Sequence, residues 1–398
     1  MASTPTAWDT IFPAAGADAF HRTLNLKRQV SPIEVVKFEN ARERTSRHVL
    51  AAYCYRDVFG VLRDDKDFST EIVPERYGPI LGKKTVVGMQ GPSHRTIRRA
   101  FAAALSPAEV SRMREETLIP TINGLIDRFD HRHRRADLVG EFAQLLPVSV
   151  TLQLLGISIA EAHRIRRCVS DALNFATNPL PAMRSARELR SIIRASRING
   201  NDPLGGRLVR AVTSDGSEDI PEVDLVNHLL LLLVAGVETT THALGTALAC
   251  AFQLGAGRPA EFALDDKQRA QLVEESLRWE SPIQATSRKA ASDGLELAGH
   301  ELPRGSVLIA HLGSANRDET VYPHADRIDP HNGRDTPHLA FGAGPHRCIG
   351  MHLARAEMDA AIATLMAGLP NIRPDVDASR LRVEGGLFRG VQQLPVSW

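Results

Sequence analysis

The longest apolar stretch of the chain, residues 229–236, is a run of leucines followed by valine, alanine and glycine. Its apolar side chains point all round a helix, whereas a surface helix would keep a polar stripe. Residues 219–254 are therefore predicted to form a helix through the middle of the protein, with Pro221 at its first position and Gly255 as its stop. The apolar run is too short to span a membrane.

The rest of the hydrophobic pattern predicts a mainly α-helical chain with a small β-rich lobe. Strand-like segments separated by turns cover residues 47–55, 294–302 and 305–312. Helical patterns cover residues 57–62, 107–128, 138–155, 159–177, 181–198 and 351–365. A further helix is predicted to begin at residues 92–93, with Ser93 as its N-cap. Residues 72–91 are predicted to form a long apolar loop, which either covers a functional site or packs on its own core.

Composition narrows the class of protein. The chain of 398 residues has 43% hydrophobic and 24% charged residues, as is usual for a globular protein. Its net charge of +1 does not support nucleic-acid binding. No linker interrupts the pattern, so residues 1–398 are predicted to form a single domain.

Two features of the sequence favour a cytoplasmic location. Residues 1–9 lack the basic and apolar regions of a signal peptide, and no membrane anchor is expected. The 4 cysteines are few and scattered, which fits a reducing compartment. We expect a cytoplasmic monomer.

One of those cysteines, Cys348, lies in a glycine-rich segment, Phe341-Gly-Ala-Gly-Pro-His-Arg-Cys-Ile-Gly350. Gly342, Gly344 and Gly350 can take backbone angles that other residues avoid. The helical pattern that follows puts the thiol just before a helix N-terminus, where the helix dipole and backbone N–H groups favour a thiolate. A buried structural cysteine and a single thiolate ligand of a haem iron both fit this segment.

This cysteine loop resembles the haem-binding loop of the cytochrome P450 family of haem-thiolate monooxygenases. The family pattern, Phe-Gly-x-Gly-x-His/Arg-x-Cys-x-Gly, is met at every fixed position. The resemblance implies the cytochrome P450 fold, in which a long central helix crosses over haem b, with Cys348 as the axial ligand of the iron. It also implies haem contacts from Phe341, Gly342, His346 and Gly350.

The predicted central helix carries a second point of resemblance. Residues 235–240 are similar to the family's oxygen-activation motif, Ala-Gly-x-Asp/Glu-Thr. By this resemblance, Ala235 and Gly236 leave room beside the haem, Thr239 supplies a hydroxyl and Glu238 delivers protons. Taken alone, the simpler interpretation is a threonine bonded to its own helix carbonyl and an incidental acid.

Two further sets of charged residues match the family in its order along the chain. The resemblance implies contacts to the haem propionates from His94, Arg98 and Arg288. Without it, His94 and Arg98 would be read as one exposed cationic face of a helix. Glu275 and Arg278 match the family's buried Glu-x-x-Arg salt bridge, and Arg327 matches the later arginine that joins it to hold the cysteine loop. The resemblance extends over residues 47–398.

In the family, the segment matching residues 72–91 roofs a substrate pocket, and the break at residues 178–179 matches a mobile lid. The residues that this resemblance predicts to line the pocket are mostly apolar: Val86, Val87, Phe175, Leu232, Ile283, Ala285, Thr286, Leu387 and Phe388. This lining indicates a small lipophilic substrate without naming it.

The resemblance implies a monooxygenase that inserts one atom of O2 into such a substrate by hydroxylation or epoxidation, as in secondary metabolism. Electrons would come from NAD(P)H through a ferredoxin reductase and a ferredoxin, because the chain has no flavin or iron–sulfur motif. One alternative is an enzyme of the same fold that uses peroxide or carries out oxidative coupling or rearrangement, and another is a non-catalytic haem sensor. The Glu238–Thr239 pair argues against both, since family members that use peroxide typically lack it and a sensor needs no proton delivery.

Overall fold

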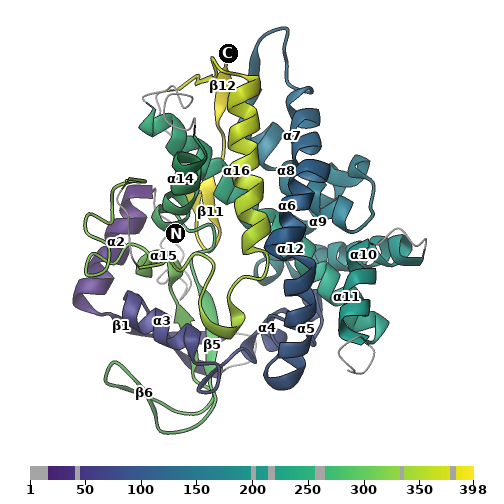
Figure 1. The fold of residues 1–398 in the computed structure, drawn as a ribbon. Helices are drawn as coiled ribbons and strands as arrows, with labels where there is room; N and C mark the ends of the chain where they lie inside the picture. The colour runs from purple at the N-terminus through teal and green to yellow at the C-terminus, as the bar shows by residue number, and fades with distance from the viewer. Residues whose placement is uncertain are drawn as a thin grey trace. The chain divides into compact units, whose positions relative to one another are not determined.

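The computed structural model describes residues 17–40, 45–198, 203–213, 220–255, 265–331, 336–376 and 382–398. The interpretation of residues 1–9 lies outside this part of the chain. The chain is mainly helical (Figure 1). It divides into two compact units, each assembled from separate stretches. The first unit contains Met1–Ile72, Glu274–Cys348 and Arg382–Gly390, and the second contains Val73–Val273, Ile349–Leu381 and Val391–Trp398.

The first unit is built on a mixed sheet. Its strand order is β1 (Ile33–Asn40), β2 (Thr45–Ala52), β8 (Val307–Ala310), β5 (Thr286–Ala290) and β3 (Phe68–Ser69). Strands β2 and β8 run parallel, and the other neighbours run antiparallel. The strands predicted near residues 47–55 and 305–312 are thus confirmed as a parallel pair of one sheet.

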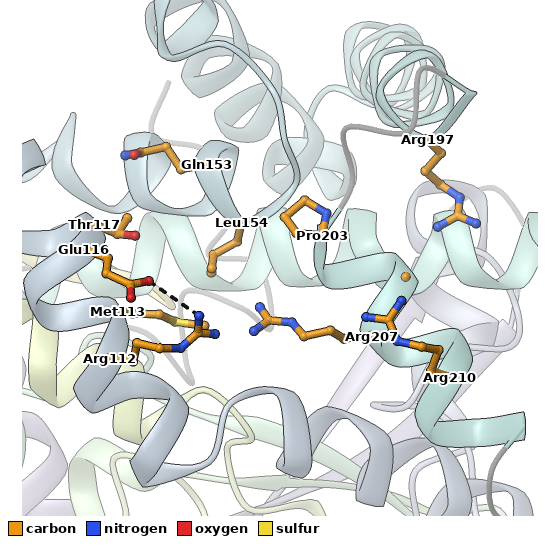
Figure 2. Close-up of a pocket in the computed structure, with 11 residues that line it drawn as sticks. Arg112, Met113, Glu116, Thr117, Gln153, Leu154, Arg197, Pro203, Arg207 and Arg210 are labelled. Carbon is orange, nitrogen blue, oxygen red and sulfur yellow. Dashed lines mark ion pairs between the residues drawn. The ribbon is translucent and has the colours of Figure 1, made fainter.

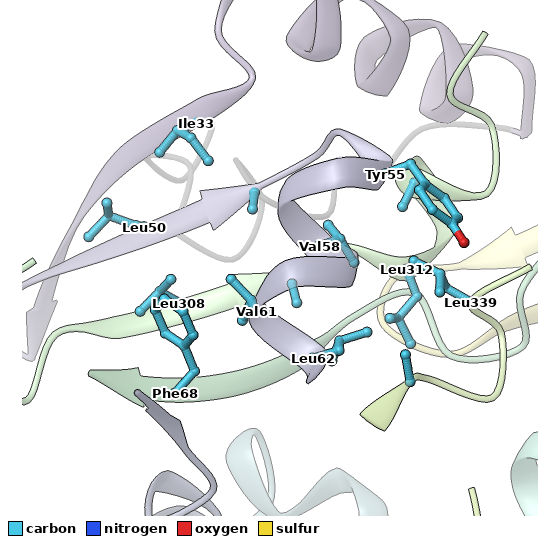
Figure 3. Close-up of a cluster of buried hydrophobic side chains, with 14 of the residues drawn as sticks. Ile33, Leu50, Tyr55, Val58, Val61, Leu62, Phe68, Leu308, Leu312 and Leu339 are labelled. Carbon is cyan, nitrogen blue, oxygen red and sulfur yellow. The ribbon is translucent and has the colours of Figure 1, made fainter. Parts of the chain in front are cut away.

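A short helix, α3 (Tyr55–Arg63), packs its apolar face against this sheet. Val58, Val61 and Leu62 follow the spacing of one helix face, and all are fully or almost fully buried. They form a core with side chains from the sheet and from the loops beyond it, which Figure 3 shows around Ile33, Leu50, Phe68, Leu308, Leu312 and Leu339. Helix α2 (Ala17–Val30) adds Phe20 and Leu24 to a second cluster.

The first unit also carries smaller elements. These are the hairpin strands β6 (Leu295–Leu297) and β7 (His300–Leu302), the helix α15 (Leu312–Ala315), the turn η5 (Gly344–His346) and the strands β10 (Val383–Gly385) and β11 (Arg389–Val391). The last of these, β11, ends at the first residue of a second-unit stretch. Helix α14 (Asp266–Trp279) begins in the second unit and ends in the first.

Helices dominate the second unit. In chain order they are α5 (Gly91–Ala104), α6 (Pro107–Met113), α7 (Ile119–Ile126), α8 (Leu146–Leu154), α9 (Ala162–Leu173), α10 (Pro179–Ile198), α11 (Pro203–Thr213), α12 (Glu222–Leu254) and α16 (Met351–Gly368). Short π or 3-10 turns join some of them: η1 (Arg114–Leu118), η2 (Leu138–Ala143), η3 (Ile159–Glu161) and η4 (Asn174–Ala176). A small sheet of β4 (Arg135–Asp137), β12 (Pro395–Ser397) and β9 (Arg373–Pro374) completes this unit.

The predicted central helix is confirmed as α12, which packs against α8, α9, α10 and α16. Gly255 is its C-cap as expected, whereas Pro221 is the N-cap and not the first helical residue. The whole helix has 33 residues and is long and apolar enough, by length and composition, to cross a membrane. The apolar run of residues 229–236 alone did not predict such a long helix. In its most apolar window 56% of the residues are buried within the protein, as expected of a core helix.

Two local predictions were wrong. Residues 72–91 were predicted to form a long loop, but they include a helix, α4 (Ile72–Leu81). A proline in the first helical turn loses no hydrogen bond, so Pro74 does not prevent the helix. The next helix, α5, has Gln90 as its N-cap, which puts Ser93 inside the helix.

Candidate active site

The cysteine loop has the tight turns that its glycines predict. Gly342 and Gly344 have φ values of 67° and 68°, in the left-handed region that favours glycine. The Cys348 N–H donates to the Phe341 carbonyl at 2.7 Å, which closes the loop on itself. Gly350 does not use this freedom, since its φ of −88° is open to any residue. It is the N-cap of α16, so Cys348 does precede a helix N-terminus.

The cysteine loop packs closely against the end of α3. A Cβ atom at Gly344 would lie 2.4 Å from the Leu62 carbonyl oxygen at the end of α3, so no side chain fits there. The thiol of Cys348 is exposed, whereas Cys168 and Cys250 are buried and Cys54 is half-buried. Among the four cysteines, the one in the rigid loop is therefore the most accessible to a ligand. The other predicted loop contacts, Phe341 and His346, are half-buried.

In the second unit, one face in the middle of α12 is not fully buried. Leu232, Gly236 and Thr239 are half-buried and Ala235 is exposed, and their spacing puts them on one helix face. A Cβ atom at Gly236 would meet only Thr151 Oγ1, at 4.0 Å, so no described protein atom requires a glycine at this position. We call these four residues the exposed face of α12.

Thr239 and Glu238 differ in how they are held. The Thr239 hydroxyl donates to the Ala235 carbonyl one turn earlier, at 2.7 Å, as the simpler interpretation of this residue expected. Glu238 Oε1 lies 3.3 Å from His242 Nε2. Burial raises the pKa of Glu238, but the His242 hydrogen bond and the charges of His242 and Arg166 outweigh it and leave the pKa below its usual range.

Sequence reasoning had not singled out His242. It follows Glu238 by four residues in the same helix, a spacing that brings side chains together. That spacing was the available signal, and the family pattern does not include it. The ring is mostly buried, and its Nδ1 has no hydrogen-bond partner among the described residues. A titratable ring therefore stands beside the predicted acid.

The predicted propionate contacts come from both units. In the second, His94 is buried and Arg98 half-buried, one turn apart on α5 as expected. In the first, Arg288 on β5 is buried, and burial lowers its pKa to about 10 despite the charge of Asp65. Its Nη1 donates to the Thr286 hydroxyl and the Ser287 carbonyl at 3.3 and 2.8 Å, and its Nε has no partner among the described residues. A buried guanidinium with neutral acceptors fits an anionic group of a cofactor.

The predicted Glu275–Arg278 salt bridge is present and buried, with N–O distances of 2.7 and 2.8 Å. Arg278 uses all its N–H groups, because it also donates to the carbonyls of Asn316, Ala325 and Arg327. The prediction for the Arg327 side chain was wrong: that residue is exposed and contributes its backbone carbonyl. Asn316 accepts the Leu339 N–H at 2.6 Å, so this network reaches the segment before the cysteine loop.

Several predicted pocket residues are joined within the first unit. Ile283 and Phe388 form an antiparallel bridge, and the next residue, Gln284, donates its N–H to the Leu387 carbonyl at 2.8 Å. Ala285 is buried, whereas Ile283, Thr286, Leu387 and Phe388 are half-buried. The segments after α14 and before β11 therefore present their side chains together.

The remaining pocket predictions fall in the second unit, where Val86 is fixed to α12. Its N–H donates to His228 Nδ1 at 3.3 Å, and burial lowers the pKa of His228 to about 4, so the ring is neutral and can accept. Arg190 of α10 adds a tie, donating to the Ile80 carbonyl at 2.6 Å and to Asn227 of α12 at 2.9 Å. Val87 is 36% exposed, and Phe175 is half-buried in η4.

Comparison with known proteins gives one consistent result. The cytochrome P450 family model matches residues 270–368. Mycinamicin IV hydroxylase/epoxidase of Micromonospora griseorubida is 34% identical over 86% of this chain and 88% of that protein. Vitamin D3 dihydroxylase of Streptomyces griseolus is 31% identical over 78% of this chain and 77% of that protein. A solved myxobacterial cytochrome P450 in complex with myristic acid has a TM-score of 0.82 and 26% identity, covering 98% of both chains.

Proposed function

The chain belongs to the cytochrome P450 family, and from that premise we propose that Cys348 is its axial iron ligand and that the exposed face of α12 serves the oxygen chemistry. The protein is a haem-thiolate monooxygenase that inserts one atom of O2 into an organic substrate. It uses haem b and electrons from NAD(P)H delivered by redox partners. Haem, when bound, supplies the redox and oxygen chemistry, and a thiolate ligand favours O–O cleavage.

The observation that carries the assignment of Cys348 is its exposed thiol in a loop whose turns only glycine permits. In Cys348→Ser, the reduced protein with carbon monoxide should lose the red-shifted Soret band typical of thiolate ligation. Cys168→Ser, which changes a buried cysteine of α9, is the matched control and should keep the band. A normal band in Cys348→Ser would show that another residue holds the iron.

The chain's own groups suit proton delivery along α12. Glu238 is held ionised beside His242, so it takes up a proton only transiently and can pass it toward Thr239. The Thr239 hydroxyl donates to Ala235 and keeps lone pairs that accept a further hydrogen bond, and rotation of its side chain lets it donate instead. The neighbouring Ala235 and Gly236 leave room for a reacting group.

The remaining predicted contacts divide by charge. Arg288, Arg98 and His94 would hold the propionates, since a carboxylate accepts strong hydrogen bonds from guanidinium groups and can also accept one from a ring N–H. Val86, Ile283, Leu387 and Phe388 would contact the substrate, which supports a small, largely apolar molecule. Relatives named as a hydroxylase/epoxidase and a dihydroxylase support hydroxylation or epoxidation as the reaction. Titrating lipophilic compounds and recording the shift of the Soret band on binding would identify the substrate class.

The electron donor is proposed to be an acidic ferredoxin with its reductase. Arg347, exposed beside Cys348, supports this choice, because a cation near the iron ligand steers an acidic partner. NAD(P)H-dependent turnover with a ferredoxin and its reductase, compared with turnover on added peroxide, separates this function from the peroxide-driven alternative. A cytoplasmic monomer in which residues 1–398 act as a single domain completes the proposal.

A further inference from the structure

A cavity in the second unit is lined by none of the residues predicted to contact haem or substrate. It has a volume of about 650 Å³ and is formed by α6, η1, α8, α10 and α11. Its lining, shown in Figure 2, consists of Arg112, Met113, Glu116, Thr117, Gln153, Leu154, Arg197, Pro203, Gly206, Arg207 and Arg210. None of these residues was predicted to contact haem or substrate, and the volume lies within the range of small-molecule sites.

Positive charge dominates this cavity. Four arginines and one glutamate line it, a net charge of +3. Glu109, which accepts from Arg112 at 2.6 Å and from Arg207 at 2.7 Å, lowers this to +2. The whole chain carries a net charge of only +1, so the cavity concentrates positive charge that the rest of the molecule balances. A concave site of one sign attracts ligands of the opposite sign.

The arginines converge from different elements. In Figure 2, Arg112 of α6 and Arg207 of α11 point toward one another across the cavity. Arg197 of α10 and Arg210 of α11 lie at the other end. Because Gly206 has no side chain, the Arg210 guanidinium can lie close to the backbone of α11. A Cβ atom at Gly206 would be 3.4 Å from Arg210 Nη1. Arg112 pairs with Glu109 and Glu116, and Arg207 pairs with Glu109. A guanidinium group has five N–H donors, so these carboxylates leave donors of both arginines for a bound anion.

Two other features add to the recognition of an organic anion. The helix α11 begins at Pro203, and its first turn lines the cavity, so the positive end of the helix dipole adds to the positive charge there. This turn contains no acidic residue that would cancel the effect. The buried side chains of Met113 and Leu154 give the cavity an apolar part. Such a part suits a ring or chain attached to the anionic groups.

We propose that this arginine-lined cavity binds a small organic molecule that carries two or more phosphate groups, such as a nucleoside diphosphate. Single phosphates would occupy a small part of about 650 Å³, whereas a nucleotide also reaches the apolar side chains. The concave shape favours a small molecule over a nucleic-acid backbone, which would track a groove or stripe along the surface.

Calorimetry on the haem-loaded full chain tests the proposal with three probes: ADP, inorganic pyrophosphate and adenosine. ADP should bind, pyrophosphate should bind more weakly, and adenosine should not bind. Raising the salt concentration should weaken binding, because the attraction is between charges. If ADP and pyrophosphate bind equally well, the organic group is not recognised, and the ligand is a free polyphosphate and not the organic phosphate proposed here.

Substitutions separate this cavity from general surface charge. Arg197→Gln and Arg210→Gln should each weaken ADP binding roughly tenfold, as expected for the loss of a charge-assisted hydrogen bond. Arg184→Gln, at an exposed position of α10 outside the cavity, should leave it unchanged. Gly206→Asp should abolish binding without removing an arginine, because it puts a carboxylate against Arg210. Thermal unfolding and the haem spectrum should stay normal in that variant.

Three further results would overturn the proposal. The first is no heat of binding for ADP or pyrophosphate at low salt. The second is an equal loss of affinity in Arg184→Gln and Arg210→Gln. The third is binding of heparin or DNA alone, which would make the arginines part of a surface for macromolecules. Because the readout is binding, none of these results depends on the proposed oxygen chemistry.

Discussion

At the scale of single residues, the hydroxyl of Thr239 is shared between its own helix and the proposed chemistry. It donates to Ala235 in this structure, so its function must come from its lone pairs or from rotation. Thr239→Ala should keep haem content, substrate affinity and NAD(P)H consumption while diverting most electrons to hydrogen peroxide, because the donor at the reacting oxygen is lost. The ratio of product to NAD(P)H consumed measures this effect.

The neighbouring threonine supplies the control for that experiment. Thr240 is buried and lies about 100° further round the helix. Thr240→Ala should therefore leave the ratio of product to NAD(P)H unchanged. Normal coupling in Thr239→Ala would show that the motif does not carry the chemistry, and would favour a member of the family that does not hydroxylate.

His242 leads to a prediction about pH. Its hydrogen bond and charge lower the pKa of Glu238, so His242→Gln should raise that pKa. If the ionised carboxylate relays protons, the acidic limb of the turnover profile should move to higher pH, and the loss of rate should be greatest at the acidic end. His300→Gln, at an exposed position on β7, is the control. An unchanged acidic limb in His242→Gln would make the histidine a packing residue only.

At the scale of elements, Arg278 joins α14 to the segment that leads to the cysteine loop. It is 2% exposed and satisfies one carboxylate and three carbonyl groups. Arg278→Ala should destabilise the fold by roughly 3–5 kcal/mol, since it leaves the buried Glu275 carboxylate without its partner. Arg278→Lys should not rescue it, because an ammonium group cannot reproduce the fork of donors.

The measurement for Arg278 is haem content per folded protein together with the unfolding midpoint in urea. Arg304→Ala, an exposed arginine of the same unit, should behave like the native chain. Haem-replete, normally stable Arg278→Ala would contradict the structural role of the network.

Elements also show why the sequence revealed some of the site and not the rest. The motifs around Cys348 and Glu238 could be found because their residues are neighbours along the chain. The tie from Arg190 to Ile80 joins residues 110 positions apart, and no local pattern reports it. Helix α4 contains Pro79, and a proline inside a helix is an exception that no local pattern predicts.

At the scale of the whole molecule, the two units divide the predicted chemistry between them. Cys348 and Arg288 belong to the first, while Glu238, Thr239 and His94 belong to the second. The first unit also buries a cluster of charged residues: Glu280 accepts from His21 at 2.7 Å and from Arg389 at 3.1 Å. The Arg389 guanidinium lies 3.8 Å from the centre of the Phe20 ring. This cluster ties the N-terminal helix α2 to the segment after α14.

Buried neutral histidines make the stability of the molecule depend on pH. Burial, helped by nearby positive groups such as His21 and Arg28, lowers the pKa of His311 to about 3, and burial alone lowers that of His228 to about 4. In the unfolded chain these rings take up protons near pH 6.5. At these two rings the unfolded state therefore binds more protons between pH 6.5 and about 3, so the stability that they contribute is lost as the pH drops through that range.

His311 allows a direct test of this dependence. Its Nδ1 accepts the Ser314 N–H at 3.1 Å as the N-cap of α15, and asparagine can cap a helix without titrating. His311→Asn should lower the unfolding temperature at pH 8, because the smaller side chain fills less space. The unfolding temperature of His311→Asn should also fall less between pH 6.5 and 4 than that of the native chain. His300→Asn, which changes an exposed ring, should leave both values as they were. Equal slopes in the native chain and His311→Asn would show that other groups govern acid unfolding.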